Sequence, residues 1–234
     1  MIWGSFMAAI GQIADPRFLR VTALGVALTV ALLFGVYGAT LWLLEWVAPD
    51  TVTIPFVGPI GGIDTLIGIG SILVMIGLSV FLMVPVASAF SGLFLDTVAQ
   101  AVEDRHYPTL PAATPLPLMD TVIGSVNFFG LVVFLNLLAL IAYIFAGPLA
   151  PILFWVVNGY LLGREYFSLA AERRLPKDQA RQLRRANGGK IWLAGILMAA
   201  PLSVPLVNLL IPVLGAATFT HLFHRLLRQA PFQG

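Results

Sequence analysis

The sequence predicts an all-α integral membrane protein, and three observations lead to that prediction. Of its 234 residues, 59% are hydrophobic and only 10% are charged, whereas soluble domains average about 25% charged residues. The apolar runs are continuous rather than alternating, which disfavours a transmembrane β-barrel. Glycine and proline interrupt several of these runs. We therefore expect a single membrane domain over residues 1–234, with two long transmembrane helices and two proline-broken helical hairpins that penetrate the membrane part-way.

The first fourteen residues predict a short amphipathic helix that lies at the membrane interface. Their apolar side chains recur at helical spacing, at Ile2, Trp3, Phe6, Ile10 and Ile13. Asp15 then has the character of an N-cap, and Pro16 suits the first position of a new helix because its missing N–H is not needed there. A second helix is therefore expected to begin at this Asp-Pro pair.

The two long transmembrane helices are predicted at residues 21–47 and 63–90. The first run carries no charge before Glu45, and it exceeds the roughly 20 residues that cross about 30 Å of hydrocarbon. The connecting loop contains no Lys or Arg. The second run is interrupted only by Asp64 near its start and by Pro85 near its end. It returns the chain to the side from which it started.

The two hairpins are predicted at residues 122–162 and 191–220, both of which are uncharged. Helix-breaking residues lie inside both runs: Gly147, Pro148 and Pro151 in the first, and Pro201, Pro205 and Pro212 in the second. Proline removes a backbone donor and clashes with the preceding turn, so one straight helix is not expected in either run. The second run is too short for two full crossings at 1.5 Å per residue.

A basic segment at residues 163–190 separates the hairpins. The stretch 158–190 holds eight of the 13 Lys and Arg residues, and the others lie at 17–20, 105 and 225–228. If each hairpin enters the membrane and returns, all of these charges lie on one face, which the positive-inside rule assigns to the cytoplasm. Both termini and the basic segment are thus expected to be cytoplasmic. The arginines of this segment are expected to attract anionic lipids.

Several stretches resemble the CysZ sulfate permease family and the wider etoposide-induced membrane proteins. They are Tyr166 with the basic connector through Pro176, PLVNLLIPVLGAAT at 205–218, AFSGLF at 89–94 followed by Val102 and Glu103, and the turn from Pro16 to Arg20. The resemblance implies two long transmembrane helices with two hemi-penetrating hairpins. It also implies sulfate uptake across the bacterial inner membrane to supply cysteine synthesis.

In that family, a proline-glycine, aliphatic, double-arginine turn at the start of the first long helix binds the anion. Here the glycine position holds Arg17 and the first arginine position holds Leu19, so only Arg20 matches directly. Arg17 and Arg20 are the candidate substrate-binding residues, because a helix N-terminus and guanidinium forks both suit a tetrahedral oxyanion. Three alternatives stay open: the site has shifted by one turn, another anion or none is bound, or the two arginines only anchor the helix at lipid headgroups. Asp15 argues against the site, because as N-cap it would occupy the same donors.

A second candidate site is a gating network. Arg164 and Glu165 lie where the third apolar segment ends, and adjacent helical residues do not face each other. We expect their partners on other segments, at Glu103 and Arg105; simple solvation at the interface is the alternative. Asn208 is expected at the tip of the last hairpin, where exposed backbone can line a cavity; hydrogen bonding between membrane helices is the alternative.

The remaining motifs favour a transporter over an enzyme. There is no cysteine and no Walker-type loop, and no nucleophile lies near a base. His221 and His224 share a helical face without a third metal ligand, so no metal or cofactor is expected. Nucleic-acid binding is also not expected. Two spans enclose no pore, so a homo-oligomer or the hairpins must complete one. Sulfate permeation, channel-like or proton-coupled, is the first hypothesis, and a non-transporting membrane scaffold is the second.

Overall fold

The computed structural model describes residues 1–47, 53–54, 58–59, 95–111, 113, 118–204, 207 and 210–230, most of which are helical. The helices are α1 (Ile2–Gly11), α2 (Pro16–Val47), α4 (Asp96–His106), α5 (Leu118–Ala146), α6 (Ala150–Glu172), α7 (Lys177–Ala186), α8 (Gly188–Ala199) and α10 (Ile211–Leu227). Two 3₁₀ turns, η2 (Gly147–Leu149) and η3 (Ala200–Ser203), follow α5 and α8, and the short strands β1 (Thr53–Ile54) and β2 (Gly58–Pro59) pair antiparallel. The all-α prediction is confirmed, whereas the second predicted span, residues 63–90, lies outside the described residues.

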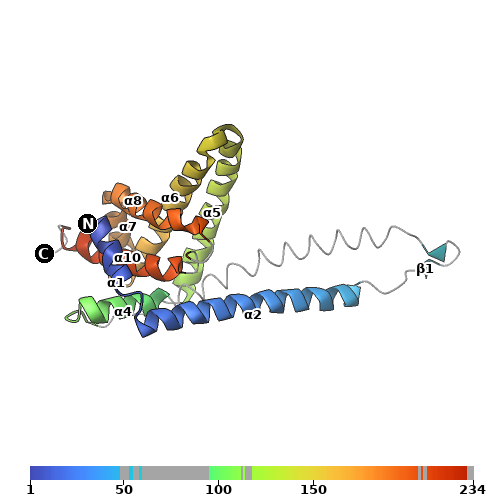
Figure 1. Cartoon of the computed structure of the whole chain (residues 1–234), viewed down its shortest axis with the longest axis horizontal. Helices are drawn as coiled ribbons and strands as arrows, with labels where there is room; N and C mark the ends of the chain where they lie inside the picture. The colour runs from blue at the N-terminus through green and yellow to red at the C-terminus, as the bar shows by residue number, and fades with distance from the viewer. Residues whose placement is uncertain are drawn as a thin grey trace.

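Helix α2 begins at the predicted Asp-Pro pair. The Asp15 carboxylate accepts a hydrogen bond from the Arg17 backbone N–H at 2.9 Å, so the predicted N-cap is confirmed. The helix then runs for 32 residues, about 48 Å at 1.5 Å per residue, and extends away from the other helices (Figure 1). Phe18 and Val21 near its start are buried, whereas Phe34 further along is 72% exposed. Only the first turns of α2 therefore belong to the packed part of the molecule.

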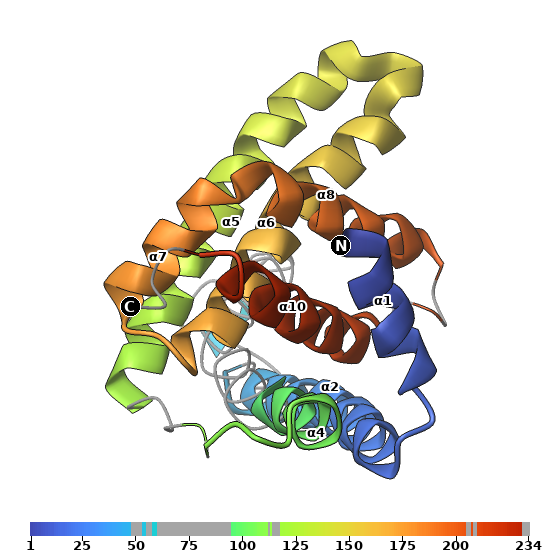
Figure 2. The same cartoon turned by 90° about the vertical axis from the view of Figure 1, so that its left-hand side faces the viewer.

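Helices α5 and α6 form the first hairpin and lie side by side (Figures 1 and 2). The chain turns at η2, where Gly147 takes a φ of +49° that L side chains rarely adopt. By length and composition, the helical run Val126–Glu172 that contains this turn is apolar enough to cross a membrane, and 6% of its most apolar window is buried. Phe145 next to the turn is 85% exposed. The turn lies at the predicted Gly-Pro break, and the depth of the hairpin stays a prediction.

The second predicted hairpin, residues 191–220, contains most of α8, η3 and the first part of α10. Pro201 lies in η3 and Pro212 in the first turn of α10, so prolines fall where helical structure ends or begins. Asn208, the predicted hairpin tip, lies outside the described residues. Helix α10 is the central element of the packed part, where α1, α4, α6 and α8 surround it (Figure 2).

The core is made mainly of large side chains from α10 and α6. Phe219 and Phe223 of α10 are fully buried together with Phe167 of α6. Helix α1 packs on α10 through the small buried residues Ser5 and Ala9, and it leaves Trp3 62% exposed. The predicted interfacial helix is therefore docked on the core by Ser5 and Ala9, with Ile2 and Phe6 partly buried against the same core. Its outer face is the one that carries exposed apolar side chains.

Helices α6 and α8 cross at unusually close range because glycine lies on both sides. A Cβ atom built on Gly195 of α8 would overlap the carbonyl oxygen of Gly159 and would lie 2.8 Å from the backbone nitrogen of Gly163. Gly159 and Gly163 are four residues apart on α6, the small-xxx-small spacing that lets helix backbones approach in membranes. The Trp192 indole N–H adds a hydrogen bond to the carbonyl of Val156 at 3.0 Å.

The close glycine crossing predicts that G195A lowers the free energy of unfolding by about 1–3 kcal/mol. The added methyl group would meet backbone atoms, which no rotamer change can move away. Unfolding in mixed micelles measures this loss. G189A in the same helix is the matched control: a Cβ atom placed on Gly189 has nothing within 4 Å, and alanine has the higher helix propensity. Equal unfolding midpoints for G195A and wild type would contradict the close crossing.

Candidate polar site at the junction of α4, α6 and α10

The candidate site is centred on Glu103, a carboxylate buried where three helices meet. One face of α4 packs into the core through Val98, Ala101 and Val102, and Glu103 lies on the same side of the helix. Its side chain is 3% exposed. A buried charge of this kind is tolerated only when it is paired and hydrogen-bonded. The surrounding residues meet that requirement from two other helices.

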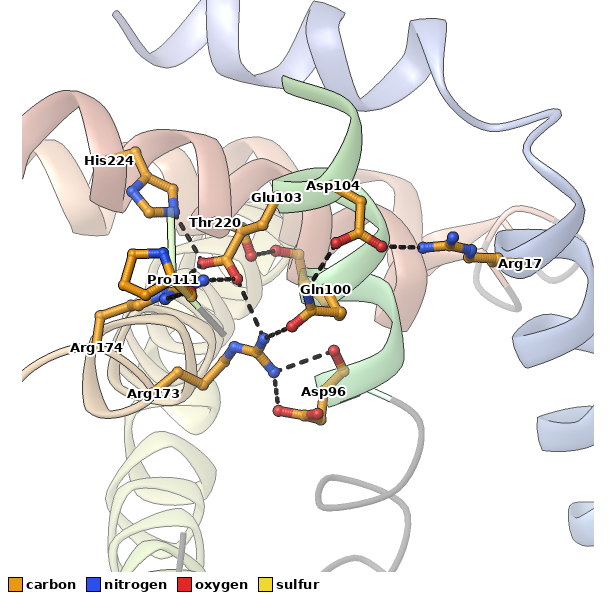
Figure 3. Close-up of polar contacts among 11 residues, drawn as sticks. Arg17, Asp96, Gln100, Glu103, Asp104, Pro111, Arg173, Arg174, Thr220 and His224 are labelled. Atoms are coloured by element: carbon orange, nitrogen blue, oxygen red, sulfur yellow. Dashed lines mark hydrogen bonds and ion pairs between the residues drawn. The ribbon is translucent and has the colours of Figure 1, made fainter. Parts of the chain in front are cut away.

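Both oxygens of Glu103 are occupied by charged or polar donors (Figure 3). The Arg174 guanidinium contacts it with two nitrogens, Nε to Oε1 at 3.0 Å and Nη2 to Oε2 at 2.6 Å. Arg173 adds Nη2 to Oε2 at 3.2 Å, and His224 of α10 places Nε2 2.9 Å from Oε1. Both arginines directly follow the last residue of α6, where the negative end of the helix dipole favours cations. Glu103 thus connects α4 to the end of α6 and to α10.

Burial and hydrogen bonding shift the pKa values of charged groups at this junction. Burial alone would raise the pKa of Glu103, but hydrogen bonds from His224 and Arg174 outweigh it, so the pKa lies below its usual value of 4.5. Burial lowers the pKa of Arg173 to about 10, which leaves the guanidinium charged at neutral pH. Arg173 also pairs with the carboxylate of Asp96 and donates to Gln100 Oε1 at 3.0 Å. The junction therefore contains two guanidinium groups held between two carboxylates.

A second layer of contacts links this junction to the start of α2. Asp104, the neighbour of Glu103, accepts from Arg17 Nη1 at 2.5 Å and from Gln100 Nε2 at 2.7 Å. Unlike the Glu103 pairs, the Arg17–Asp104 pair is about half-exposed, with side-chain exposures of 54% and 45%. The buried amide of Gln12 bridges Asp15 Oδ2 and the Ala101 carbonyl, at 3.0 and 3.1 Å. These contacts fix the α1–α2 corner against α4.

A histidine and tyrosine cluster covers the other side of the junction. The Tyr107 hydroxyl lies 3.1 Å from His221 Nδ1, and the Tyr107 ring lies 4.2 Å from the His224 ring. Burial lowers the pKa of His221 to about 3, so this imidazole is neutral at physiological pH. Within the described ranges, no group of three or more His, Cys, Asp or Glu side chains is arranged to hold a metal ion.

A pocket of about 140 Å³ opens beside the junction, and it is predominantly polar. Its lining comes from α4, from the chain that follows α4 and from the end of α6, through Gln100, Glu103, Asp104, Tyr107, Pro108, Leu110 and Arg174. The charged groups in this lining already have partners within the protein, because Glu103 binds Arg174 and Asp104 binds Arg17. The pocket is thus a polar opening beside ion pairs that are already formed within the protein.

The predicted gating residues are not brought together in one cluster. Glu103 is at the junction, but its ion-pair partners are Arg173, Arg174 and His224. Arg105 is exposed in the last turn of α4. Arg164 and Glu165 lie on α6 more than two turns before Arg173 and are half-buried. The prediction brought Arg164 and Glu165 to α4, whereas the structure brings Arg173 and Arg174, which follow the end of α6, to Glu103. A gating role stays a prediction.

The predicted anion-binding residues both lie in the first turn of α2. Arg17 is exposed and engaged by Asp104. Arg20 is also exposed and has no hydrogen bond or ion pair with another described side chain. Sequence reasoning missed Asp104, and it treated His224 only as half of a metal pair. The one signal in the sequence for the buried junction was the adjacent pair Arg173–Arg174, which directly follows the last residue of α6.

The buried junction predicts that E103Q lowers the free energy of unfolding by roughly 3–5 kcal/mol, because two buried guanidinium groups lose their common counter-charge. Denaturant unfolding in mixed micelles measures the loss. D104N removes the neighbouring carboxylate from an exposed pair, so its effect is expected to be much smaller. If E103Q and D104N had equal effects, Glu103 would not be the central contact.

The lowered pKa of Glu103 predicts a pH dependence of stability. The unfolded chain takes up this proton near pH 4.5 and the folded protein only at lower pH, so the stabilisation is complete above about pH 5.5 and is lost as the pH falls through the folded pKa. Unfolding measured from about pH 6 to 3 is expected to show a steeper decline for wild type than for E103Q. Asp15 and Asp104, whose pKa values are also lowered, contribute a slope to both proteins. Identical slopes would contradict the prediction.

Comparison with known families agrees with the sequence resemblance. The family described as "Sulfate transporter CysZ/Etoposide-induced protein 2.4" matches residues 5–212, which include most of the junction and both arginines of the first turn of α2. Neither the curated proteins nor the solved structures yielded a match. The family is one of sulfate-transporter-like membrane proteins, which fits the apolar run Val126–Glu172. Because the match extends over most of the sequence, this chain belongs to the sulfate transporter CysZ/etoposide-induced protein 2.4 family.

Proposed function

We propose that this protein is a permease for sulfate or a related tetrahedral oxyanion in the bacterial inner membrane, where it supplies sulfur for cysteine synthesis. The observation that carries the proposal is the family match over residues 5–212. The exposed arginines in the first turn of α2 support it, because this is the place where the family resemblance puts the anion. We propose a transporter rather than an enzyme, with no cofactor and no nucleic-acid partner.

The first turn of α2 has the chemistry that an oxyanion needs. Arg17 and Arg20 are three residues apart, so their side chains project from neighbouring positions of one helical face. Guanidinium groups bind tetrahedral oxyanions with two parallel N–H donors, and the positive end of the helix dipole adds a favourable field. Arg20 is the residue best placed to hold the anion, because Arg17 is already engaged by Asp104.

The arrangement of the chain ends supports the proposed topology. The Arg225 guanidinium near the end of α10 donates to the carbonyls of Met1 and Gly4, at 3.1 and 3.2 Å. The beginning of the chain and the end of α10 therefore lie together, as cytoplasmic termini on one face require. The basic helix α7 buries Ala180 and Leu183 and exposes Arg181 and Arg185, which suits contact with anionic lipids.

Exposed apolar side chains support assembly into a homo-oligomer within the membrane. Phe34 on α2 and Phe145 on α5 are 72% and 85% exposed, and such surfaces mark contacts with lipid or with another protein surface. Since one chain with two long spans encloses no path, neighbouring copies or the hairpins are proposed to complete it. The Glu103 junction is proposed to gate that path, because it links α4, α6 and α10.

A non-transporting membrane scaffold is the second candidate function. Two contacts favour it: Asp15 occupies the backbone donor of Arg17, and Asp104 occupies its guanidinium. In a scaffold these pairs would only hold α2 against α4, and both arginines would lie among lipid headgroups. The same transport experiment separates the two functions.

Uptake of radiolabelled sulfate into proteoliposomes tests the permease. Wild type is expected to exceed empty vesicles, and R20A is expected to lose most of that uptake, because it removes a guanidinium that has no partner among the described side chains. R181A on α7 is the charge-matched control and is expected to retain uptake. Folded wild-type protein that transports no sulfate at any pH or gradient tested would reject the permease and favour the scaffold.

A further inference from the structure

We infer that Asp104 is an internal competitor of the transported anion and sets the affinity of the site at the start of α2. Its carboxylate lies on the same guanidinium that an oxyanion would bind, at 2.5 Å from Arg17 Nη1. The inference rests on the proposed permease function, and it names a residue that determines the affinity of that site. Loading of the anion is then an exchange, in which the oxyanion takes the place of the carboxylate.

The chemistry of the pair supports an exchange of like for like. Asp104 contacts Arg17 through one oxygen, Oδ2, whereas one edge of a tetrahedral oxyanion presents two oxygens to a guanidinium fork. The Arg17–Asp104 pair is exposed enough for an anion from solution to reach it, since the two side chains are 54% and 45% exposed. By contrast, the guanidinium groups around Glu103 are buried. Of these ion pairs, Arg17–Asp104 suits exchange best.

The backbone of α4 holds Asp104 in a fixed position beside Arg17. Its neighbour Glu103 points into the molecule and binds the end of α6 and α10, so Asp104 projects from α4 toward α2 (Figure 3). Gln100 holds the second oxygen of Asp104 at 2.7 Å and is itself held by Arg173 at 3.0 Å. The competing carboxylate is therefore oriented by the buried junction and does not depend on a flexible loop.

Exchange at this pair has a mechanical consequence for the helices. The Arg17–Asp104 contact joins the first turn of α2 to the last turns of α4. An anion that takes over Arg17 breaks that contact and removes one link between the start of α2 and α4, while the Gln12 contact to the Ala101 carbonyl stays in place. Arg20, which lacks an internal partner among the described residues, then shares the anion with Arg17. Anion binding and the loss of the Arg17–Asp104 contact are thus the same event.

Sulfate binding to the purified full chain, measured by isothermal titration calorimetry at low ionic strength, tests the inference. Removal of the competitor by D104N is expected to tighten sulfate binding by about two- to fivefold, a modest gain because exposed pairs are weak and screened by salt. D104E keeps the competing charge and is expected to bind sulfate as wild type does. D178N on α7 makes the same charge change away from the site and is expected to leave the affinity unchanged.

A double-mutant cycle separates competition from a general charge effect. In the R17A background, D104N is expected to change sulfate affinity much less than it does in wild type, because the contested guanidinium is absent. If wild type binds sulfate and D104N binds it equally or more weakly, the inference is overturned while the permease proposal stands. If no folded variant binds sulfate, the proposed function fails and the inference fails with it.

Discussion

The packed part of this protein depends on one buried carboxylate shared by three cationic or polar partners. Burial of Glu103 depends on Arg173, Arg174 and His224, and burial of the two arginines depends in turn on Glu103, with Asp96 as a second partner of Arg173. The need to satisfy these groups together fixes α4, the end of α6 and α10 in one arrangement. The start of α2 is then positioned by Asp104, one residue further along α4. The geometry of a site at the first turn of α2 therefore depends on the buried Glu103 junction.

The molecule combines two kinds of surface. Around α10 the helices bury their apolar side chains as a soluble domain does, and α10 is buried from Val213 to His224. The α5–α6 hairpin and most of α2 instead expose large apolar side chains, Phe145 among them. Large exposed apolar surfaces of this kind are typical of contact with lipid or with another protein. The proposed anion site lies where α2 leaves the helices that pack around α10.

The sequence predicted correctly those features that a few neighbouring residues determine. The Asp15–Pro16 start of α2 and the turn at Gly147 follow from capping and from backbone freedom, which a few neighbouring residues decide. The partners of Glu103 lie 70 to 121 residues away in the chain, and tertiary packing alone selects them. Arg173 and Arg174 lie in a segment rich in arginine and lysine. Its composition does not distinguish these two buried arginines from the exposed ones. Asp104 was missed because its contact with Arg17 forms only once the fold places α2 beside α4.

The most direct test of an anion site on α2 is anomalous diffraction at the selenium edge from crystals soaked in selenate, a heavier tetrahedral oxyanion. The expected result is an anomalous peak beside Arg17 and Arg20, with the Asp104 carboxylate displaced from Arg17. Selenate bound elsewhere would contradict the proposed site, and an intact Arg17–Asp104 pair at saturating selenate would contradict the exchange at Arg17.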